Sequence, residues 1–237
     1  MTKYACTISH GRFNLHITML DISNLHLHEE TIPNLLDKLA QSITLDGCLK
    51  HPVIVDKASL VVLDGMHRVA ALEKLECKRI PVCLVDYKNP AITVGCWYRA
   101  IKGAKALEHV LTQARQLGLK IEKVEKIDDA KIGLSSIVAA VKNRKDAFFI
   151  YFSFRSLKEA YDIIKQIEEG LEQLALEVTY ETELDALTKL QDHEVDAVLL
   201  TPKLTKSSII NAALSRSLFS YKTTRHIIPA RPLYLNV

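Results

Sequence analysis

Five consecutive residues, Asp64-Gly65-Met66-His67-Arg68, have types and spacing suited to binding an anion. An apolar run ends at Leu63 and a helical pattern of apolar residues starts at Val69, which predicts a strand-to-helix turn between them. The first amides of a helix lack partners within it, and the helix dipole adds positive potential there. Such a turn attracts phosphate, and a histidine and an arginine add two further donors.

The same five residues also allow a purely structural explanation. An aspartate before a glycine at a helix start is often only an N-cap, and an arginine in the first turn is often only solvated. The turn by itself therefore predicts either a phosphate site or an ordinary helix cap, and other parts of the chain have to distinguish the two.

Length and composition describe an ordinary globular protein. The chain has 237 residues, of which 48% are hydrophobic and 25% charged, and its formal net charge is +3. No stretch approaches about 18 uninterrupted apolar residues and Met1–Tyr4 begin no signal-peptide core, so we expect a cytoplasmic protein without a membrane partner. The small net charge and the scattered basic residues do not predict nucleic-acid binding. The sequence leaves the oligomeric state open.

The cysteines and histidines predict no structural metal site. The five cysteines are odd in number and include no C-x-x-C pair, so neither a zinc site nor a disulfide framework is expected. His26 and His28 precede Glu29 and Glu30, but their spacing matches no helical zinc motif, and a polar loop is the commoner explanation.

The first part of the chain, residues 1 to about 103, has the pattern of a small domain with strands and helices. Strands are predicted at 17–20, 51–55, 60–63 and 80–87, with 56–59 as a hairpin connection. Helices are predicted from Pro33 to about Ser42 and from His67 to about Leu75. An extended piece at 92–98 carries the only tryptophan, Trp97, which is either a core anchor or the wall of a ligand pocket.

The second part, residues 104–237, alternates strands and helices. Helices are predicted at 105–117, 156–174, 182–191 and 204–214, and strands at 120–124, 146–152, 176–180 and 196–200. The alternation predicts a second α/β lobe, a sheet covered by helices, and it contains no glycine-rich phosphate loop. Near its end, Lys222-Thr223-Thr224-Arg225-His226 places two hydroxyls and three possible cations in five positions, as a surface turn or as part of a ligand site.

Several short motifs follow one another along both parts of the chain. They are His28-Glu29, Ser42 with Thr44, the turn at 64–68, Trp97-Tyr98 with Lys102-Gly103, and Lys222–His226. Together they resemble the free L-serine kinases of the ParB/sulfiredoxin-like superfamily. The resemblance implies an α+β fold with a nucleotide-binding domain of that type at 1–103. It also implies an α/β lobe at 104–237 whose C-terminal tail returns to the active site.

The resemblance further implies a reaction and the residues that perform it. The reaction is phosphoryl transfer from ATP or ADP to the hydroxyl of free L-serine, which gives O-phospho-L-serine for cysteine or related amino-acid biosynthesis. Glu29 would be the general base, with Asp64 and His67 as further catalytic residues and Asp64 as the candidate ligand of Mg²⁺. The implied nucleotide-binding residues are Ser42, Thr44, Gly65, Met66, His67 and Arg68. The implied serine-binding residues are Trp97, Lys222, Thr223, Thr224, Arg225 and His226.

Two alternatives stay open beside a serine kinase. The first is a non-catalytic ParB-like module that senses nucleotide or associates with DNA, although no basic helix-turn-helix is evident after residue 103. The second is a kinase of the same fold that acts on another small alcohol. Met66 stands where sulfiredoxins carry their reactive cysteine, so sulfinic-acid reduction is not expected.

Overall fold

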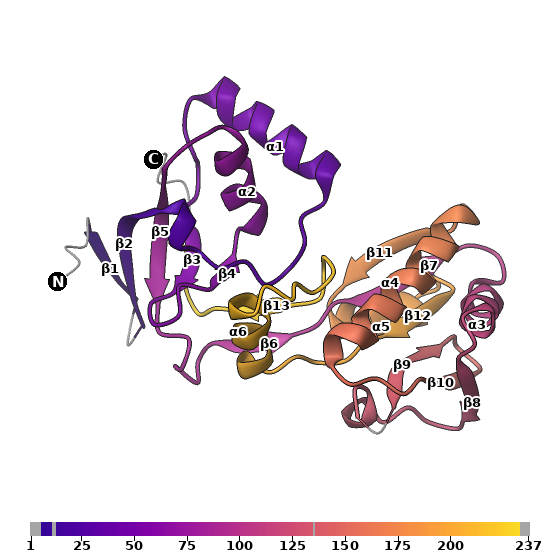
Figure 1. Ribbon diagram of the computed structural model, residues 1–237. Coiled ribbons are helices and arrows are strands. Elements are labelled where there is room, and N and C mark those ends of the chain that lie inside the picture. The colour runs from indigo at the N-terminus through magenta and orange to yellow at the C-terminus, as the bar shows by residue number, and fades with distance from the viewer. Residues whose placement is uncertain (1–5, 11–12, 135, 233–237) are drawn as a thin grey trace. The chain divides into compact units, whose positions relative to one another are not determined.

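The computed structural model describes residues 6–10, 13–134 and 136–232, and the chain forms two compact units (Figure 1). The first unit contains the chain up to Thr93, Thr205–Tyr221 and the chain from His226 on. The second unit contains Val94–Leu204 and Lys222–Arg225. Among the described residues, none of the helices combines the length and the apolar character that a membrane span requires. The segment Met1–Tyr4, considered above, lies outside the described residues.

A five-stranded sheet in the order β1-β2-β5-β3-β4 forms the centre of the first unit. Its strands are β1 (Cys6–His10), β2 (Phe13–Asp21), β5 (Arg79–Val85), β3 (Val53–Asp56) and β4 (Val62–Asp64). β3 is parallel to β5, whereas the other neighbouring pairs are antiparallel. The predicted hairpin between the third and fourth strands is thereby confirmed, while β1 was not predicted.

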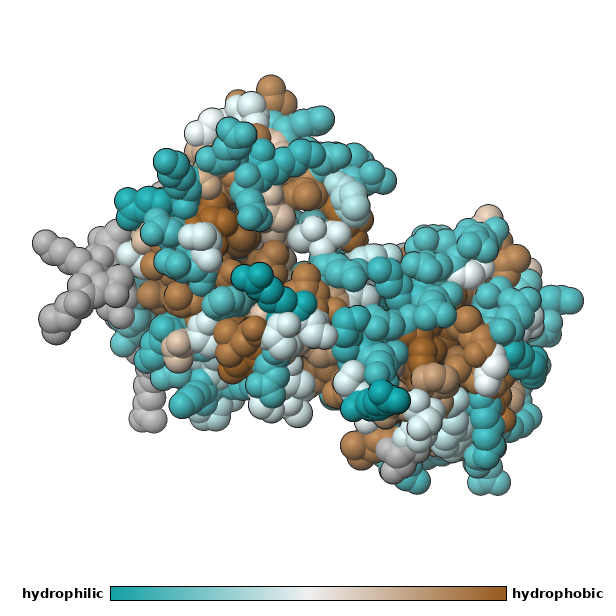
Figure 2. Space-filling model, in the orientation of Figure 1, coloured by the Kyte–Doolittle hydropathy of each residue, from teal (hydrophilic) through white to brown (hydrophobic). Residues whose placement is uncertain are grey.

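Helices α1 (Pro33–Asp46) and α2 (Met66–Lys74) pack against each other in this unit, which also contains α6 (Lys206–Leu214) and the short 3-10 helix η1 (Ile22–Asn24). Buried valines and leucines of β3, β4, β5 and α2 form the core. α1 continues past its predicted end at Ser42, because the left-handed residue that stops it is Gly47, with φ 66°. Leu35 and Leu45 of α1 are exposed, and the surface there mixes hydrophobic and hydrophilic residues (Figure 2).

The second unit is built on a six-stranded antiparallel sheet in the order β11-β7-β12-β9-β10-β8. The strands are β11 (Glu177–Glu181), β7 (Tyr98–Lys102), β12 (Ala197–Leu200), β9 (Ile137–Lys142), β10 (Ala147–Tyr151) and β8 (Lys120–Val124). The helices are α3 (Ala106–Gln116), α4 (Leu157–Gln173), α5 (Glu183–Gln191) and the 3-10 helix η2 (Asp129–Lys131). Tyr98 and Ala100 pack with α5 on one face of the sheet, while α3 and α4 contact each other and further strands.

The two units divide the chain differently from the predicted boundary after residue 103. Residues 94–103 belong to the second unit because β7 pairs with β11 and β12 inside its sheet. Conversely, α6 belongs to the first unit, where Lys206 Nζ donates to the carbonyl oxygens of Tyr87 and Asn89. The short strands β6 (Thr93–Gly95) and β13 (Arg225–Ile227) form a separate two-stranded sheet.

Candidate functional site

The predicted turn is the junction at which β4 ends and α2 begins. Gly65 is the N-cap of α2 and has φ 103°, a conformation that glycine adopts without strain. A Cβ at this position would lie 2.7 Å from Cγ1 of Val53 and 2.8 Å from Cζ of Arg68, so the space also requires glycine. Among the described residues, no side chain caps α2. An anion could therefore complete the start of this helix.

Asp64 does not cap the helix but pairs with two arginines. Its Oδ2 lies 3.2 Å from Nη2 of Arg68 and 2.5 Å from Nη1 of Arg231. Arg68 is not simply solvated either, because Nη1 donates to the carbonyl oxygens of His51 and Pro52 and its side chain is only 18% exposed. Burial lowers the pKa of Arg68, and Asp64 opposes that shift. Two guanidinium groups against one carboxylate leave a local excess of positive charge.

Glu29 lies on an extended segment beside β4. His26 bridges Val61 in a parallel register, and two residues further on the side chain of His28 bonds the carbonyl oxygen of Val62. On its other side Glu29 bridges Phe219. The Glu29 side chain is 8% exposed. The carboxylate implied as general base thus lies on the segment that runs from the bridge at Val61 to the start of α1.

Two histidines attach this segment to β4 and α2. Nδ1 of His28 lies 2.8 Å from the carbonyl oxygen of Val62, and because a carbonyl only accepts, this nitrogen carries the proton. Burial lowers the pKa of His28 to about 4, so the ring is neutral, and its Nε2 lies 3.9 Å from Oε1 of Glu29. The backbone N–H of Ile32 donates to Nε2 of His67 at 2.9 Å. His67 therefore joins the starts of α1 and α2, and Nδ1 is the nitrogen through which it could contact a phosphate.

His226 is buried in the first unit. Its Nε2 lies 2.8 Å from the hydroxyl of Tyr87, and its ring also hydrogen-bonds the backbone of Leu63 in β4. Burial, reinforced by His28 and Arg231, lowers the pKa of His226 to about 3, and burial raises the pKa of Tyr87. The neutral His226 ring therefore accepts from the tyrosine hydroxyl. These contacts give His226 a packing role next to β4.

Ser42 and Thr44 lie apart from the turn. Pro33, where α1 starts, follows the residue bonded to His67, and Ser42 is about 14 Å further along the helix at about 1.5 Å per residue. Each hydroxyl bonds within α1. Thr44 lines a groove of about 540 Å³ together with Lys74 and Leu75, at the far end of α2. The structure does not bring these two hydroxyls to the residues of the turn.

In the second unit, Trp97 is the centre of a cluster formed with the segment Lys222–Arg225. The indole Nε1 donates to the carbonyl oxygen of Thr224 at 2.9 Å. Nζ of Lys222 lies 5.2 Å and Cζ of Arg225 lies 5.9 Å from the ring centroid, within the range of cation–π contacts. Trp97 therefore lies against the motif, half-buried, rather than in the core.

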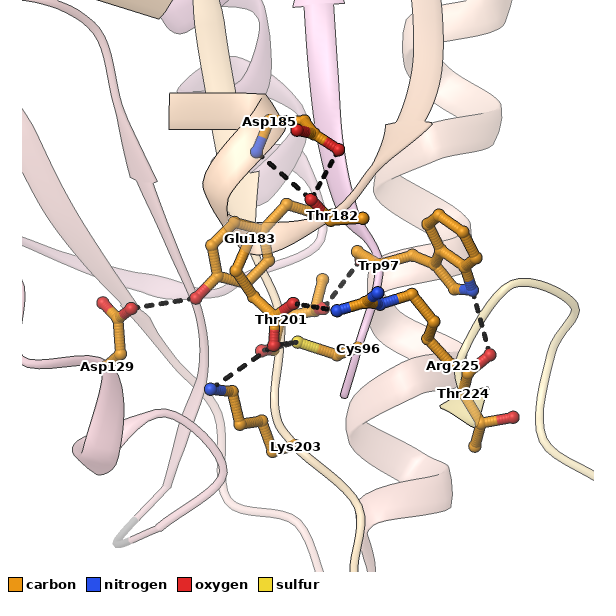
Figure 3. A network of polar contacts seen from close by, with 11 residues as sticks. Cys96, Trp97, Asp129, Thr182, Glu183, Asp185, Thr201, Lys203, Thr224 and Arg225 are labelled. Atoms are coloured by element: carbon orange, nitrogen blue, oxygen red, sulfur yellow. Dashed lines mark hydrogen bonds and ion pairs between the residues drawn. The ribbon is translucent and has the colours of Figure 1, made fainter. Parts of the chain in front are cut away.

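Glu183, the first residue of α5, binds Arg225 and Lys203, which approach it from different sides (Figure 3). Both nitrogen–oxygen distances are 3.4 Å. Burial raises the pKa of Glu183, but its own backbone amide and the two cations outweigh burial and hold the pKa below its ordinary value. The buried Nε of Arg225 has no hydrogen-bond partner among the described residues. This guanidinium can therefore still donate to a ligand.

Sequence reasoning missed Arg231, Tyr87 and Glu183. Arg231 and Asp64 are 167 positions apart, and no local pattern connects residues at such a separation. The position of Glu183 at the start of a predicted helix could be read from the sequence, because an acidic residue there interacts favourably with the helix dipole. That position indicates a stabilised helix and does not reveal a partner such as Arg225.

Comparisons with known proteins address the family. No family model matches the chain. The chain is 30% identical to the ATP-dependent L-serine kinase of Staphylothermus marinus over 226 residues, which cover 92% of this chain and 88% of that protein. The chain belongs to the L-serine kinase family. The chain is also 28% identical to the ADP-dependent L-serine kinase SerK of Thermococcus kodakarensis, over 92% of this chain and 89% of that protein.

A solved structure has the same fold as this chain, and the match extends over nearly the whole of it. A free serine kinase in complex with AMP matches it with a TM-score of 0.79, over 99% of this chain and 95% of that chain, at 24% identity. At this identity the likeness concerns the fold. The family and the α+β fold class predicted from the short motifs are therefore confirmed.

Proposed function

We propose that this chain transfers a phosphoryl group from ATP or ADP to the hydroxyl of free L-serine and releases O-phospho-L-serine. The observation that carries the proposal is a buried carboxylate, Glu29, on a segment that His28 and His67 bond to β4 and to the uncapped, arginine-rich start of α2, in a chain 30% identical to an ATP-dependent L-serine kinase. Phosphoryl transfer requires that the phosphates be held, their charge balanced and the attacking hydroxyl aimed in line.

The β4–α2 turn would hold the phosphates. Gly65 allows close approach of the backbone, and the start of α2 contributes amides and the positive end of the helix dipole. Arg68 and Arg231 supply two guanidinium groups around Asp64. The transferred phosphoryl group carries its charge on peripheral oxygens, and preorganised cations stabilise that charge.

Glu29 would accept the proton of the serine hydroxyl as its oxygen attacks phosphorus. A carboxylate is a sufficient base for this step, because the hydroxyl becomes acidic only as the new bond forms. The ring of His28 is neutral, and its Nε2 lies 3.9 Å from Oε1 of Glu29. After transfer the proton remains on Glu29, and the nucleotide leaves with one phosphate fewer.

A magnesium ion fits this arrangement as a companion of the nucleotide. Mg²⁺ in such sites is usually held by substrate phosphates with one or two carboxylates. Asp64 is one carboxylate at the turn with 37% side-chain exposure, and the described residues include no group of three or more His, Cys, Asp or Glu side chains that could enclose an ion. When bound, the ion would supply charge neutralisation at the phosphate oxygens.

The cluster around Trp97 has the chemistry for recognising an amino acid. The carboxylate of serine suits a guanidinium, and Arg225 offers a buried Nε that has no partner among the described residues. Trp97 would form an apolar wall of the serine site, with Lys222, Thr223 and Thr224 around it. His226 is assigned to the serine site by family resemblance alone.

The test is product formation from serine, Mg²⁺ and either nucleotide, followed for the wild type and for Glu29→Gln. The wild type should form O-phosphoserine with at least one nucleotide, and Glu29→Gln should lose on the order of 10²-fold or more in kcat, since a general base contributes that much. Nucleotide affinity, measured by calorimetry, should stay within about twofold because the phosphate turn is intact.

Glu30→Gln is the matched control, because it removes the neighbouring carboxylate and should keep nearly normal turnover. A folded wild type that forms no O-phosphoserine with ATP or ADP would exclude the proposed reaction. Near-normal turnover of Glu29→Gln would exclude Glu29 as the base while leaving the reaction in place.

A further inference from the structure

Three successive carbonyl oxygens of the segment Lys222–Thr224 are each approached by a polar side chain of the second unit. Nη1 of Arg99 donates to the oxygen of Lys222 at 3.2 Å, and the hydroxyl of Tyr161, which donates to the carbonyl oxygen of Pro202 at 2.5 Å, lies 3.5 Å from the carbonyl oxygen of Thr223. Nε1 of Trp97 donates to the oxygen of Thr224 at 2.9 Å. Hydrogen bonds therefore hold the backbone of the motif at Lys222 and at Thr224.

The guanidinium that begins this series is fully buried. Arg99 lies on β7 and is ion-paired with Glu168 of α4, which is also buried. Burial lowers the pKa of Arg99, but Glu168 and the two tyrosines outweigh it and hold the pKa above its ordinary value, so the guanidinium is charged. The rings of Tyr161 and Tyr180 lie 5.8 and 5.2 Å from Cζ of Arg99.

A buried ion pair is a costly way to stabilise a core, because apolar residues of similar size often stabilise it as well or better. Arg99 does more than neutralise Glu168, since Nη1 also donates to the carbonyl oxygen of Trp97 at 2.6 Å. One guanidinium thus connects β7, α4 and the segment that follows Tyr221.

The held segment includes a residue in an unfavourable conformation. Lys222 has φ 57°, in the left-handed region that residues other than glycine rarely adopt. Such a conformation persists only where surrounding contacts fix it, and it is common at ligand sites. The contact of Arg99 with the Lys222 carbonyl is one such restraint, and it leaves the Lys222 ammonium group over Trp97.

We infer that Arg99 and Glu168, together with Tyr161, are positioning residues for serine recognition: they hold the backbone of Lys222–Thr224 so that the side chains of Lys222 and Arg225 face the substrate. The inference rests on the proposed function. It assigns to the buried pair an effect on serine binding rather than on nucleotide binding or on the phosphoryl transfer step.

The experiment replaces the ion pair with apolar residues in the double variant Arg99→Met/Glu168→Leu. Removing both charges avoids an unpaired buried charge, so the fold should be retained. The KM for serine should rise on the order of tenfold, as expected for lost positioning hydrogen bonds, while the KM for nucleotide stays within about twofold. Tyr161→Phe should raise the serine KM in the same direction and by less.

Fluorescence of Trp97, the only tryptophan, gives a readout that does not require activity. Loosening of Thr224 should expose the indole and shift its emission to longer wavelength in the double variant. Ile167→Ala, next to Glu168 on α4 and fully buried, is the matched control: it should lower the melting temperature but leave the serine KM and the emission maximum unchanged.

Wild-type serine KM and emission in the folded double variant would overturn the inference. So would an equal rise of the serine KM in Ile167→Ala, because it would show a merely structural effect. If the double variant does not fold, Tyr161→Phe decides by the same two readouts. If the wild type forms no O-phosphoserine, the proposed function fails, and the fluorescence of the variants still decides whether the pair holds the segment.

Discussion

At Asp64, one carboxylate oxygen receives two guanidinium groups. Arg68 is fixed by two further backbone carbonyls, whereas Arg231 is bonded in addition to the carbonyl of His226 at 2.9 Å. The two arginines therefore differ in how easily they can turn toward a phosphate. Arg231 is the more exposed of the pair, so it is the one that can leave Asp64 for a nucleotide at little structural cost.

The first prediction is that Arg231→Ala weakens nucleotide binding with little loss of stability. Removing one cation near a multiply charged phosphate should raise the dissociation constant of ADP roughly 3- to 10-fold at low salt, less at high salt. Titration calorimetry at two salt concentrations measures this. Arg79→Ala, which removes an exposed arginine paired with Asp21 in the same unit, should leave the affinity unchanged. Equal effects of the two variants would show that only net charge matters.

The β4–α2 turn is the element that sequence patterns predicted best. Apolar residues in β4 and the helical spacing from Val69 are local signals, and the glycine between them marks the break. The structure adds two reasons for a glycine at this position: a positive φ and a Cβ position already filled by Val53 and Arg68. The helix-ending Gly47 shares only the first of these, because nothing lies within 4 Å of its Cβ position.

The second prediction compares Gly65→Ala with Gly47→Ala. Gly47→Ala should cost about 1 kcal/mol, the strain of alanine in a left-handed conformation. Gly65→Ala should cost roughly 2–4 kcal/mol, since steric overlap is added to that strain, and it should also abolish nucleotide binding. Urea unfolding and nucleotide titration measure both. Similar costs for the two variants would mean that the turn relaxes around a Cβ and that close packing is unimportant there.

Across the whole molecule, the first unit depends on side chains from distant parts of the chain. His28 and His226 lie edge to face with ring centroids 5.4 Å apart, and both are neutral because burial lowers the pKa of each. Their folded pKa values of about 4 and about 3 lie below the ordinary value of 6.5. Between these values the unfolded chain binds more protons than the folded chain, so stability falls as the pH falls through this window.

The third prediction is acid sensitivity of the first unit. The urea midpoint should be constant above about pH 7 and should decrease steadily from about pH 6.5 toward pH 4. His28→Gln should be less stable at pH 7, because the bond to Val62 is disturbed, yet its midpoint should change less steeply with pH. The same slope in this variant and in the wild type would assign the acid sensitivity to other groups.

Features that depend on residues close together in the sequence could be predicted. Contacts between residues far apart in the sequence could not. The helices, the hairpin of β3 and β4 and the phosphate turn follow from periodicity and glycine, and the family resemblance pointed to Glu29. β9 was missed because its alanines carry a weak strand signal. The burial of His226, the pairing of Arg231 with Asp64 and the return of α6 to the first unit arise from packing between segments far apart in the chain.

The assembly of the first unit from separated segments has a consequence for biosynthesis. Chains emerge from the ribosome from the N-terminus at about 5–20 residues per second, so β1 to β5, α1 and α2 are complete long before α6, His226 and Arg231 exist. The second unit interrupts them, and the Asp64–Arg231 pair closes a loop of 167 positions. A nascent or truncated chain that stops before Thr205 therefore carries the phosphate turn without Arg231 and His226. Kinase activity should be acquired only after the segment that carries His226 and Arg231 has been synthesised.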